Sequence, residues 1–408
     1  MQDHPVLGQV ALGYSPILDP QRAVSALRLT VFPARPDSAP AGTDLLQVIR
    51  EVWPLQDEQG SPTARPSLSL NLASESLLHG VLQARPGPGL MLEVPAFMAG
   101  DLANADLLRG AQASGTVLVL KGRPITPLSA EVLACFGQCL VAPGEDRRDV
   151  MPQGPTAAAG RTVPSLQAGV TSSAEQEAAF KRGHTAFAGW PWGDALPAAG
   201  SRSALPTDVG TVMALLDGVD REDPVSKLEP VLRRDPTLAF RLMRYLNSPA
   251  LGLPAEVTSF GHALTLLGYN RLKRWLALLL VSSAKGPNSK VLVYAAVRRG
   301  LLMEELGREQ ADSEMRGELF ICGVFSLLNR LMQQPLSELL KSVPVPERVN
   351  QALRGDGGPY GPYLELVQAV ELESLFDIRE QTERLLLSPA VVSRAVFSAL
   401  QSARELEH

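Results

Sequence analysis

Residues 232–280 read LRRDPTLAFRLMRYLNSPALGLPAEVTSFGHALTLLGYNRLKRWLALLL, and the apolar spacing in this stretch predicts that the second half of the chain is helical. Asp235 stands directly before a proline. This pair favours a helix start, because Asp accepts hydrogen bonds from free N–H groups and proline tolerates the first turn. Leu238, Leu242 and Leu246 then recur every fourth position, which places them on one buried face.

The pattern stays helical toward the end of the chain. Ser259 is expected to cap a second helix that stops at Gly268, since glycine suits the left-handed position after a helix. A third apolar stripe comprises Leu272, Trp275, Leu276, Leu279 and Leu280. Further helices are expected near residues 288–306, 315–333, 346–354, 360–372 and 389–405.

The first half of the chain alternates short apolar runs with helical stretches. The runs are SLSLNL (67–72), LMLEV (90–94) and TVLVL (116–120), and the helical stretches cover residues 75–84 and 103–113. Runs of this kind suit buried parallel strands, and strand–helix alternation predicts an α/β domain that a barrel can close. We therefore expect an α/β domain over residues 1–196, a linker over 197–206 (PAAGSRSALP) and an all-helical domain over 207–405.

Composition restricts the function classes. The 408 residues are 45% apolar and 20% charged with a net charge of −5, which is globular and argues against non-specific nucleic-acid binding. The three cysteines, Cys135, Cys139 and Cys322, are expected to be reduced, buried thiols. The most apolar run, residues 275–281, is far shorter than the ~20 residues that a membrane helix needs, so we expect a soluble, cytoplasmic protein without membrane insertion.

The helical half resembles HDOD domains. The resemblance rests on Asp235 and its proline, on Leu246-Asn247-Ser248, on the Ser259 cap and on Gly268. It implies the helical fold of HD-type phosphohydrolases without their metal site. The chain has no His-Asp dipeptide, so its own residues also indicate that the metal site of these hydrolases is missing. Asn247 and Ser248 are candidates for an interaction surface, although such residues more often satisfy helix ends.

The first half is similar, more weakly, to EAL domains. The similar segments are YSPILD (14–19), LSLNLASESL (68–77), LMLEV (90–94) and FKRGHTAFAGWPWGDALP (180–197), while the glutamine expected in the last strand falls near Ala188. The resemblance implies a shortened barrel of the TIM type. It also implies an ancestral hydrolysis of cyclic diguanylate with two divalent metals.

The residues at the implied metal site depart from the EAL pattern. Arg28 stands where the family has its naming glutamate, and Lys121 and Gly122 replace a pair of aspartates. Asn71 and Glu93 match two metal ligands. Two divalent cations about 4 Å apart need several anionic oxygens. We therefore expect a degenerate site with no catalytic residue, no bound metal and no cofactor.

Other roles remain open for these residues. Glu93 is expected to pair with Arg28 or Lys121. The two cations could instead hold the phosphates of an unhydrolysed cyclic dinucleotide. Trp190 and Trp192 could lie exposed as an anchor for a partner, or pack against the helical half.

The resemblance as a whole is to EAL–HDOD signalling proteins of bacteria. It implies a non-catalytic adaptor or output protein in regulation related to cyclic diguanylate, whose partners are other signalling proteins. The alternatives are a cyclic-dinucleotide receptor and a residual phosphodiesterase. The identity of the partner and a homodimeric state stay open.

Overall fold

The computed structural model describes residues 4–35, 39–53, 67–145, 163–196, 207–232 and 260–406, apart from 285, 287, 342 and 344, together with Asp235 and Leu238. The chain divides into two compact units. The barrel unit comprises Met1–Asp194 and Glu365–His408, and the second unit comprises Ala195–Leu364.

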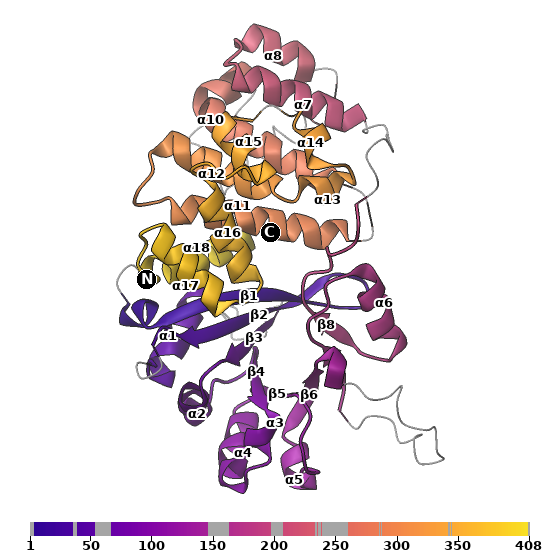
Figure 1. Ribbon diagram of the computed structural model, residues 1–408, viewed down its shortest axis with the longest axis vertical. Helices are drawn as coiled ribbons and strands as arrows, with labels where there is room; N and C mark the ends of the chain where they lie inside the picture. Colours follow the sequence, from indigo (N-terminus) through magenta and orange to yellow (C-terminus); the bar gives the residue numbers. More distant parts are fainter. Residues whose placement is uncertain are drawn as a thin grey trace. The chain divides into compact units, whose positions relative to one another are not determined.

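The barrel unit is built on a closed barrel whose strands neighbour one another in chain order, from β1 to β8 (Figure 1). β1 runs antiparallel to both of its neighbours, β2 and β8, and every other pair is parallel. The strands are β1 Val10–Leu18, β2 Val24–Pro33, β3 Ser67–Leu72, β4 Leu90–Pro95, β5 Val117–Lys121, β6 Phe136–Val141, β7 Ser165–Gln167 and β8 Ala186–Ala188. The strands expected at 67–72, 90–94 and 116–120 are confirmed, with β5 starting one residue later.

Side chains from the strands fill the middle of the barrel. The buried cluster comprises Ile17, Ala26, Met91, Val119, Leu140, Leu166 and Ala188, so this barrel has a packed core rather than a pore.

The helices that alternate with these strands are α1 Gly42–Val52, α2 Glu75–Ala84, α3 Ala96–Ala99, α4 Ala105–Ala113, α5 Ala130–Leu133 and α6 Ser173–Lys181. The short 3-10 helices are η1 Pro5–Gly8, η2 Leu102–Asn104 and η3 Pro143–Glu145. α2 starts where the sequence predicts, because the Ser74 hydroxyl accepts a hydrogen bond from the N–H of Leu77.

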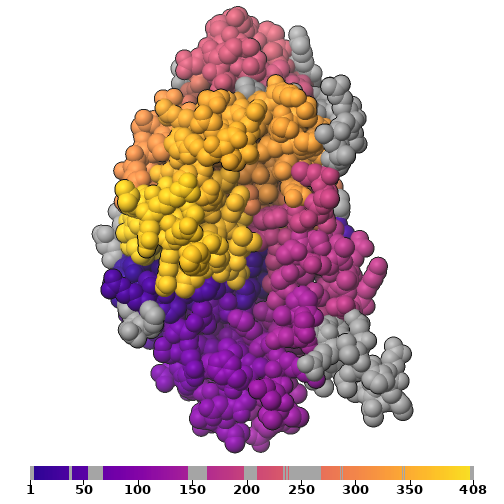
Figure 2. All heavy atoms as spheres, viewed as in Figure 1, coloured from indigo at the N-terminus to yellow at the C-terminus, as the bar shows by residue number. Residues whose placement is uncertain are grey.

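The end of the chain belongs to the barrel unit. α17 (Leu375–Arg384) and α18 (Pro389–Leu406) follow the end of α16 (Gly361–Glu371), and Figure 2 shows the yellow atoms of this segment against the indigo atoms of the first strands. α18 contacts β1, η1 and α1. Its Ser393 hydroxyl donates to the carbonyl of Val10 at 2.7 Å, and Arg404 donates to the carbonyl of Val52 at 3.2 Å.

This grouping differs from the sequence-based boundary, which assigned residues 207–405 to one helical domain. The structure gives Glu365–His408 to the barrel unit. The apolar stripe of α18 predicts a buried face, and Val396, Phe397 and Leu400 are indeed buried. Helical periodicity reports that a face is covered but not which element covers it.

The second unit contains helices and no strand among its described residues. They are α7 Thr207–Asp220, α8 Val225–Leu232, α10 Phe260–Ser282, α11 Ser289–Leu306, α12 Ser313–Phe325, α13 Leu328–Met332, α14 Leu336–Leu339, α15 Glu347–Arg354 and the start of α16. α11 and α12 lie very close, since a side chain at Gly323 would come within 2.5 Å of the carbonyl oxygen of Arg299. The break expected at Gly268 is present as a kink with φ 72° inside α10, whereas the helix expected from Asp235 to Leu246 falls largely outside the described residues.

Two further expectations concern cysteines and membranes. Cys135 and Cys322 are buried, Cys139 is half-buried, and none of the three is part of a disulfide. In the part of the chain that the structure describes, no single helix has the length and apolar character to cross a membrane. The bent pair formed by α17 and residues 389–404, with an angle of 111°, meets the criterion by length and composition alone.

Candidate functional site at the barrel mouth

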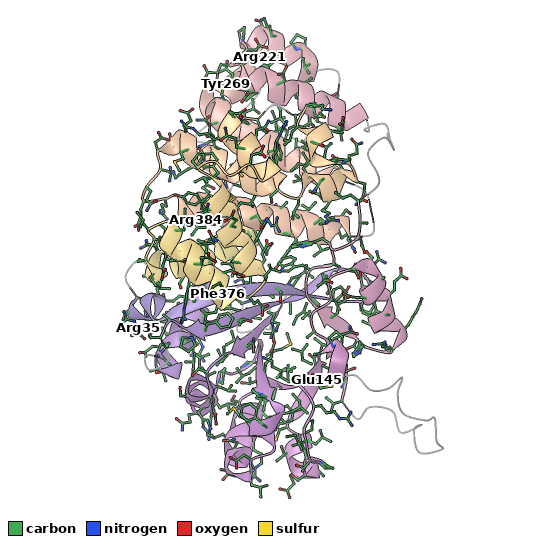
Figure 3. The ribbon with its side chains drawn as sticks, in the orientation of Figure 1. Arg35, Glu145, Arg221, Tyr269, Phe376 and Arg384 are labelled. Atoms are coloured by element: carbon green, nitrogen blue, oxygen red, sulfur yellow. The ribbon has the colours of Figure 1, made fainter. Side chains whose placement is uncertain are left out.

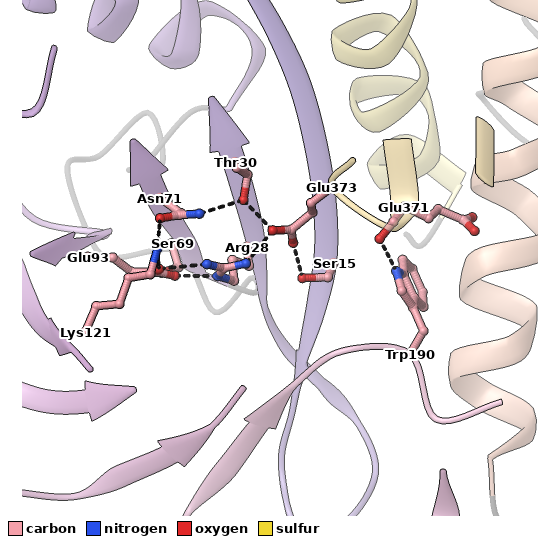
Figure 4. A network of polar contacts seen from close by, with 10 residues as sticks. All are labelled: Ser15, Arg28, Thr30, Ser69, Asn71, Glu93, Lys121, Trp190, Glu371 and Glu373. Carbon is pink, nitrogen blue, oxygen red and sulfur yellow. Dashed lines mark hydrogen bonds and ion pairs between the residues drawn. The ribbon is translucent and has the colours of Figure 1, made fainter. Parts of the chain in front are cut away.

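Neighbouring strands bring the four predicted site residues together at the carboxyl end of the barrel. Arg28 on β2 lies opposite Ser69 on β3, and the register continues to the pair formed by Thr30 and Asn71. Glu93 and Lys121 extend the row from the ends of β4 and β5. Because the carboxyl ends of parallel strands meet at one edge of a barrel, these side chains converge (Figure 4).

A two-point ion pair between Arg28 and Glu93 forms the centre of the site. The Arg28 Nε donates to Glu93 Oε1 at 2.6 Å, and its Nη2 donates to Oε2 at 2.9 Å. The Glu93 side chain is 1% exposed and that of Arg28 is 12% exposed. Burial acts to lower the pKa of Arg28, but the charges and hydrogen bonds of Glu93 and Glu373 outweigh it and raise this pKa above its ordinary value. The pairing expected from sequence is therefore confirmed, with Arg28 permanently charged.

A second chain of hydrogen bonds occupies the amide of Asn71. The Lys121 ammonium donates to Asn71 Oδ1 at 2.7 Å, and Asn71 Nδ2 donates to Thr30 Oγ1 at 3.0 Å. The Lys121 Nζ also lies 4.0 Å from Glu93 Oε2. Burial lowers the pKa of Lys121, and the charge of Glu93 partly opposes this. The amide oxygen that could otherwise bind a metal accepts instead from a protein cation.

Glu373 is the functional residue that sequence reasoning missed. It lies between α16 and α17, 345 positions from Arg28, and its carboxylate binds Arg28 Nη1. Its Oε1 accepts from Ser15 Oγ at 2.6 Å, and its Oε2 accepts from Thr30 Oγ1 at 2.6 Å (Figure 4). The segment fits closely against β1, since a side chain at Gly13 would come within 2.9 Å of the Glu373 Cα. No local pattern around residue 373 could have identified this role.

The site therefore pairs two cations with two carboxylates. The guanidinium of Arg28 lies between Glu93 and Glu373 and binds both. Within the described residues, no group of three or more His, Cys, Asp or Glu side chains could hold a metal ion. The hydroxyl and guanidinium donors of the site are directed at carboxylates, and such donors are also the groups that bind other oxyanions.

A cavity of about 690 Å³ opens beside this network. Arg28, Lys121 and Arg123 line it with Glu145, which Figure 3 labels next to the end of β6. Its apolar lining includes Ile125, which is 99% exposed. The cavity thus combines basic groups with exposed apolar side chains.

The other candidate residues lie away from this network or outside the description. Trp190 is buried, and its Nε1 donates to the carbonyl of Glu371 at 3.0 Å. Its ring stacks on that of half-buried Trp192 with centroids 4.5 Å apart. Trp190 is therefore not an exposed anchor, since it packs against the C-terminal segment of its own unit. Asn247 and Ser248 lie outside the described residues.

Comparison with protein families and curated proteins gives the following matches. The family model of the HDOD domain matches residues 205–342. The chain is 29% identical over 206 residues to "Uncharacterized protein YuxH" of Bacillus subtilis, covering 50% of each chain. It is 25% identical over 171 residues to "Cyclic di-GMP phosphodiesterase CdgJ" of Vibrio cholerae, covering 39% of this chain and 40% of that protein. The match spans half or less of these relatives.

Solved structures with similarity to the barrel region include EAL proteins. "PaMucR Phosphodiesterase, c-di-GMP complex" is 19% identical with a TM-score of 0.33, covering 47% of this chain and 93% of that one. "Crystal structure of FimX EAL domain" is 13% identical with a TM-score of 0.31, covering 44% and 88%. The strand order of this chain itself shows a closed eight-stranded barrel region. A helical region that matches the HDOD family model follows it.

Proposed function

We propose that this chain, in which a match to the HDOD domain follows the strands of a closed eight-stranded barrel, is a non-catalytic signalling protein. It acts in regulation related to cyclic diguanylate, through contacts with other signalling proteins. The observation that carries this proposal is the two-point ion pair between Arg28 and Glu93.

Electrostatics supports the loss of catalysis. Two divalent cations close together repel each other strongly, and proteins offset this repulsion with several anionic oxygens. At this mouth the carboxylate of Glu93 is already bound by Arg28, and the ammonium of Lys121 lies 4.0 Å away. A metal would have to displace a buried guanidinium and approach a second cation, so the site disfavours metal binding. Without the metals, no water is activated for hydrolysis.

The exposed apolar side chains support the role in protein contacts. Leu372 and Phe376 are 71% and 76% exposed, and Phe97 beside the cavity is 66% exposed. A contiguous exposed apolar patch commonly marks an interaction site, and we propose that Leu372 and Phe376 contribute to one.

A turnover assay tests the catalytic half of the proposal. The full-length protein is incubated with cyclic diguanylate and Mn²⁺, and the linear product is separated by chromatography. We expect no product above that of a Glu93→Ala variant. A matched control is Glu145→Ala, which alters an exposed cavity carboxylate outside the Arg28 network. Turnover that Glu93→Ala abolishes and Glu145→Ala retains would refute the proposal.

Affinity capture tests the contact half. The full-length chain and a Leu372→Ser/Phe376→Ser variant serve as paired baits in lysate of the native host. We expect a partner that the wild-type chain retains and the variant loses. Identical capture by both baits would show that these side chains do not form the contact surface.

A second candidate function is a receptor that binds a cyclic dinucleotide without hydrolysing it. The cavity of about 690 Å³ with Arg28, Lys121 and Arg123 in its lining favours it, because guanidinium and ammonium groups suit phosphates. The relative CdgJ is named a cyclic di-GMP phosphodiesterase. Calorimetric titration of the full-length protein with cyclic diguanylate tests it, and the absence of heat at high micromolar ligand would exclude it.

A further inference from the structure

The segment around α17 is the least firmly packed part of the C-terminal segment. We call residues 372–386 the latch. Within α17 only Ile378 and Thr382 are buried, while Phe376 is 76% exposed and Leu386 is 88% exposed. Figure 3 labels Phe376 and Arg384 near the two ends of this helix. Burial of apolar area supplies most of the free energy that holds a helix in place, so the latch is held weakly compared with α18.

Both ends of α17 carry a residue with a left-handed backbone. Glu373 precedes the helix with φ 54°, and Leu386 follows it with φ 55°. A residue with a Cβ adopts this conformation only at a cost in free energy. The surrounding contacts must therefore hold the latch in place, and the contacts of Glu373 are the strongest among them.

Those contacts set the charge of the barrel mouth. With the latch docked, Arg28 and Lys121 are balanced by Glu93 and Glu373. Without Glu373, the same mouth holds two cations against one carboxylate. In the docked state the Ser15 and Thr30 hydroxyls and one guanidinium nitrogen of Arg28 bind the Glu373 carboxylate. Departure of Glu373 leaves these donors free. Release of the latch thus leaves a positively charged site beside the cavity that can bind an oxyanion.

We propose that the latch is an autoinhibitory plug, in which Glu373 acts as a tethered ligand and competes with a phosphate-bearing ligand for Arg28. Latch release and anion binding are then linked reciprocally: each favours the other by the same factor. An anion that displaces Glu373 also frees the exposed apolar side chains of the latch to adopt another position. The competition holds whether or not the barrel hydrolyses anything, so it stands apart from the non-catalytic proposal.

Two variants release the latch by unrelated means. Glu373→Gln removes the charge and keeps the shape. Gly13→Ala changes no charge, but its methyl group would lie 2.9 Å from the Glu373 Cα and 3.0 Å from the carbonyl of Val370. Each has a matched control. Gly8→Ala adds a methyl group that meets α18 at an ordinary 3.8 Å, and Glu380→Gln removes a charge from the exposed side of α17.

Hydrogen exchange measures latch release in the full-length protein. We expect amide exchange in residues 375–384 to be about tenfold faster in Glu373→Gln and in Gly13→Ala, which corresponds to about 1.4 kcal/mol. The strands and both control variants should exchange as in the wild type. Unchanged exchange in residues 375–384 would overturn the latch. Faster exchange throughout the barrel would also overturn it, because Glu373 would then be part of the general fold.

Calorimetry with inorganic pyrophosphate measures the competition. Both releasing variants should bind it about tenfold more tightly than the wild type and the two controls. Equal affinities in all variants, or no binding in any, would overturn the competition. Because the probe is pyrophosphate and no turnover is measured, failure here leaves the outcome of the phosphodiesterase assay unaffected.

Discussion

Replacing Arg28 by methionine should destabilise the barrel unit strongly. The substitution keeps an unbranched side chain of similar length but leaves the 1% exposed carboxylate of Glu93 without its two-point partner. The remaining contacts of Glu93 are weak: Ser69 Oγ at 3.5 Å and Lys121 Nζ at 4.0 Å. Removing one partner of a buried ion pair typically costs about 3–5 kcal/mol, because a buried charge is left uncompensated. Since Glu373 loses the same partner, we expect the upper part of this range.

The free energy of unfolding of the barrel unit can be followed by tryptophan fluorescence in urea. Three of the four tryptophans lie in the barrel unit, and Trp275→Phe removes the fourth, which lies in the second unit. The matched control is Arg109→Met, whose partner Asp106 is 91% exposed. Exposed pairs of this kind contribute about 0.2–1 kcal/mol. Glu93→Gln should cost about 0.5–3 kcal/mol less in the Arg28→Met background than in the wild type, which is the coupling expected for residues in contact.

A loss below about 1 kcal/mol in Arg28→Met, equal to that of the Arg109→Met control, would refute this reasoning. It would mean that water or a rearranged neighbour satisfies Glu93 without Arg28. An equal cost of Glu93→Gln in the wild type and in the Arg28→Met background would contradict it in another way, because the two side chains would then not be coupled.

Three further predictions follow from other parts of the chain. Burial raises the pKa of the Cys322 thiol to about 12. Because the unfolded thiol ionises near ~8.5, stability should be lost as pH rises from that value toward 12, by up to about 1.4 kcal/mol per pH unit; a Cys322→Ala variant with the same pH profile in urea titrations would contradict this. Ser393→Ala should cost about 1–3 kcal/mol, since the buried carbonyl of Val10 loses its donor, and an unchanged urea midpoint would show that another donor replaces it. A chain ended after residue 364 should lose cooperative unfolding of the barrel in calorimetry, because β1 loses the cover of α18; an intact barrel transition would disprove that dependence.

Short-range patterns in the sequence were sufficient for the strands β3, β4 and β5 and for several of the helices. The alternation of Ser67–Leu72 predicts β3, and the helical stretch over residues 75–84 predicts α2. Gly268 interrupts a helical pattern and forms a kink in α10. These features depend on backbone preferences and on the burial of one face, and residues close together in the sequence determine both. The convergence of Arg28 and Glu93 was also accessible, because residues at the ends of parallel strands meet at one edge.

The sequence by itself therefore determined the strands β3 to β5 and several of the helices, and that a cation meets the remaining carboxylate at the barrel mouth. Only the tertiary structure decided that the last helices join the barrel unit and that Glu373 completes the charge balance there. The Arg28–Glu373 contact spans 345 positions. Local periodicity near residue 373 reports which face of a helix is covered but not which distant residue covers it, so it could not identify Arg28 as the partner. Packing of α18 against β1 brings the two groups together, and that packing depends on the complementary shape of two distant surfaces.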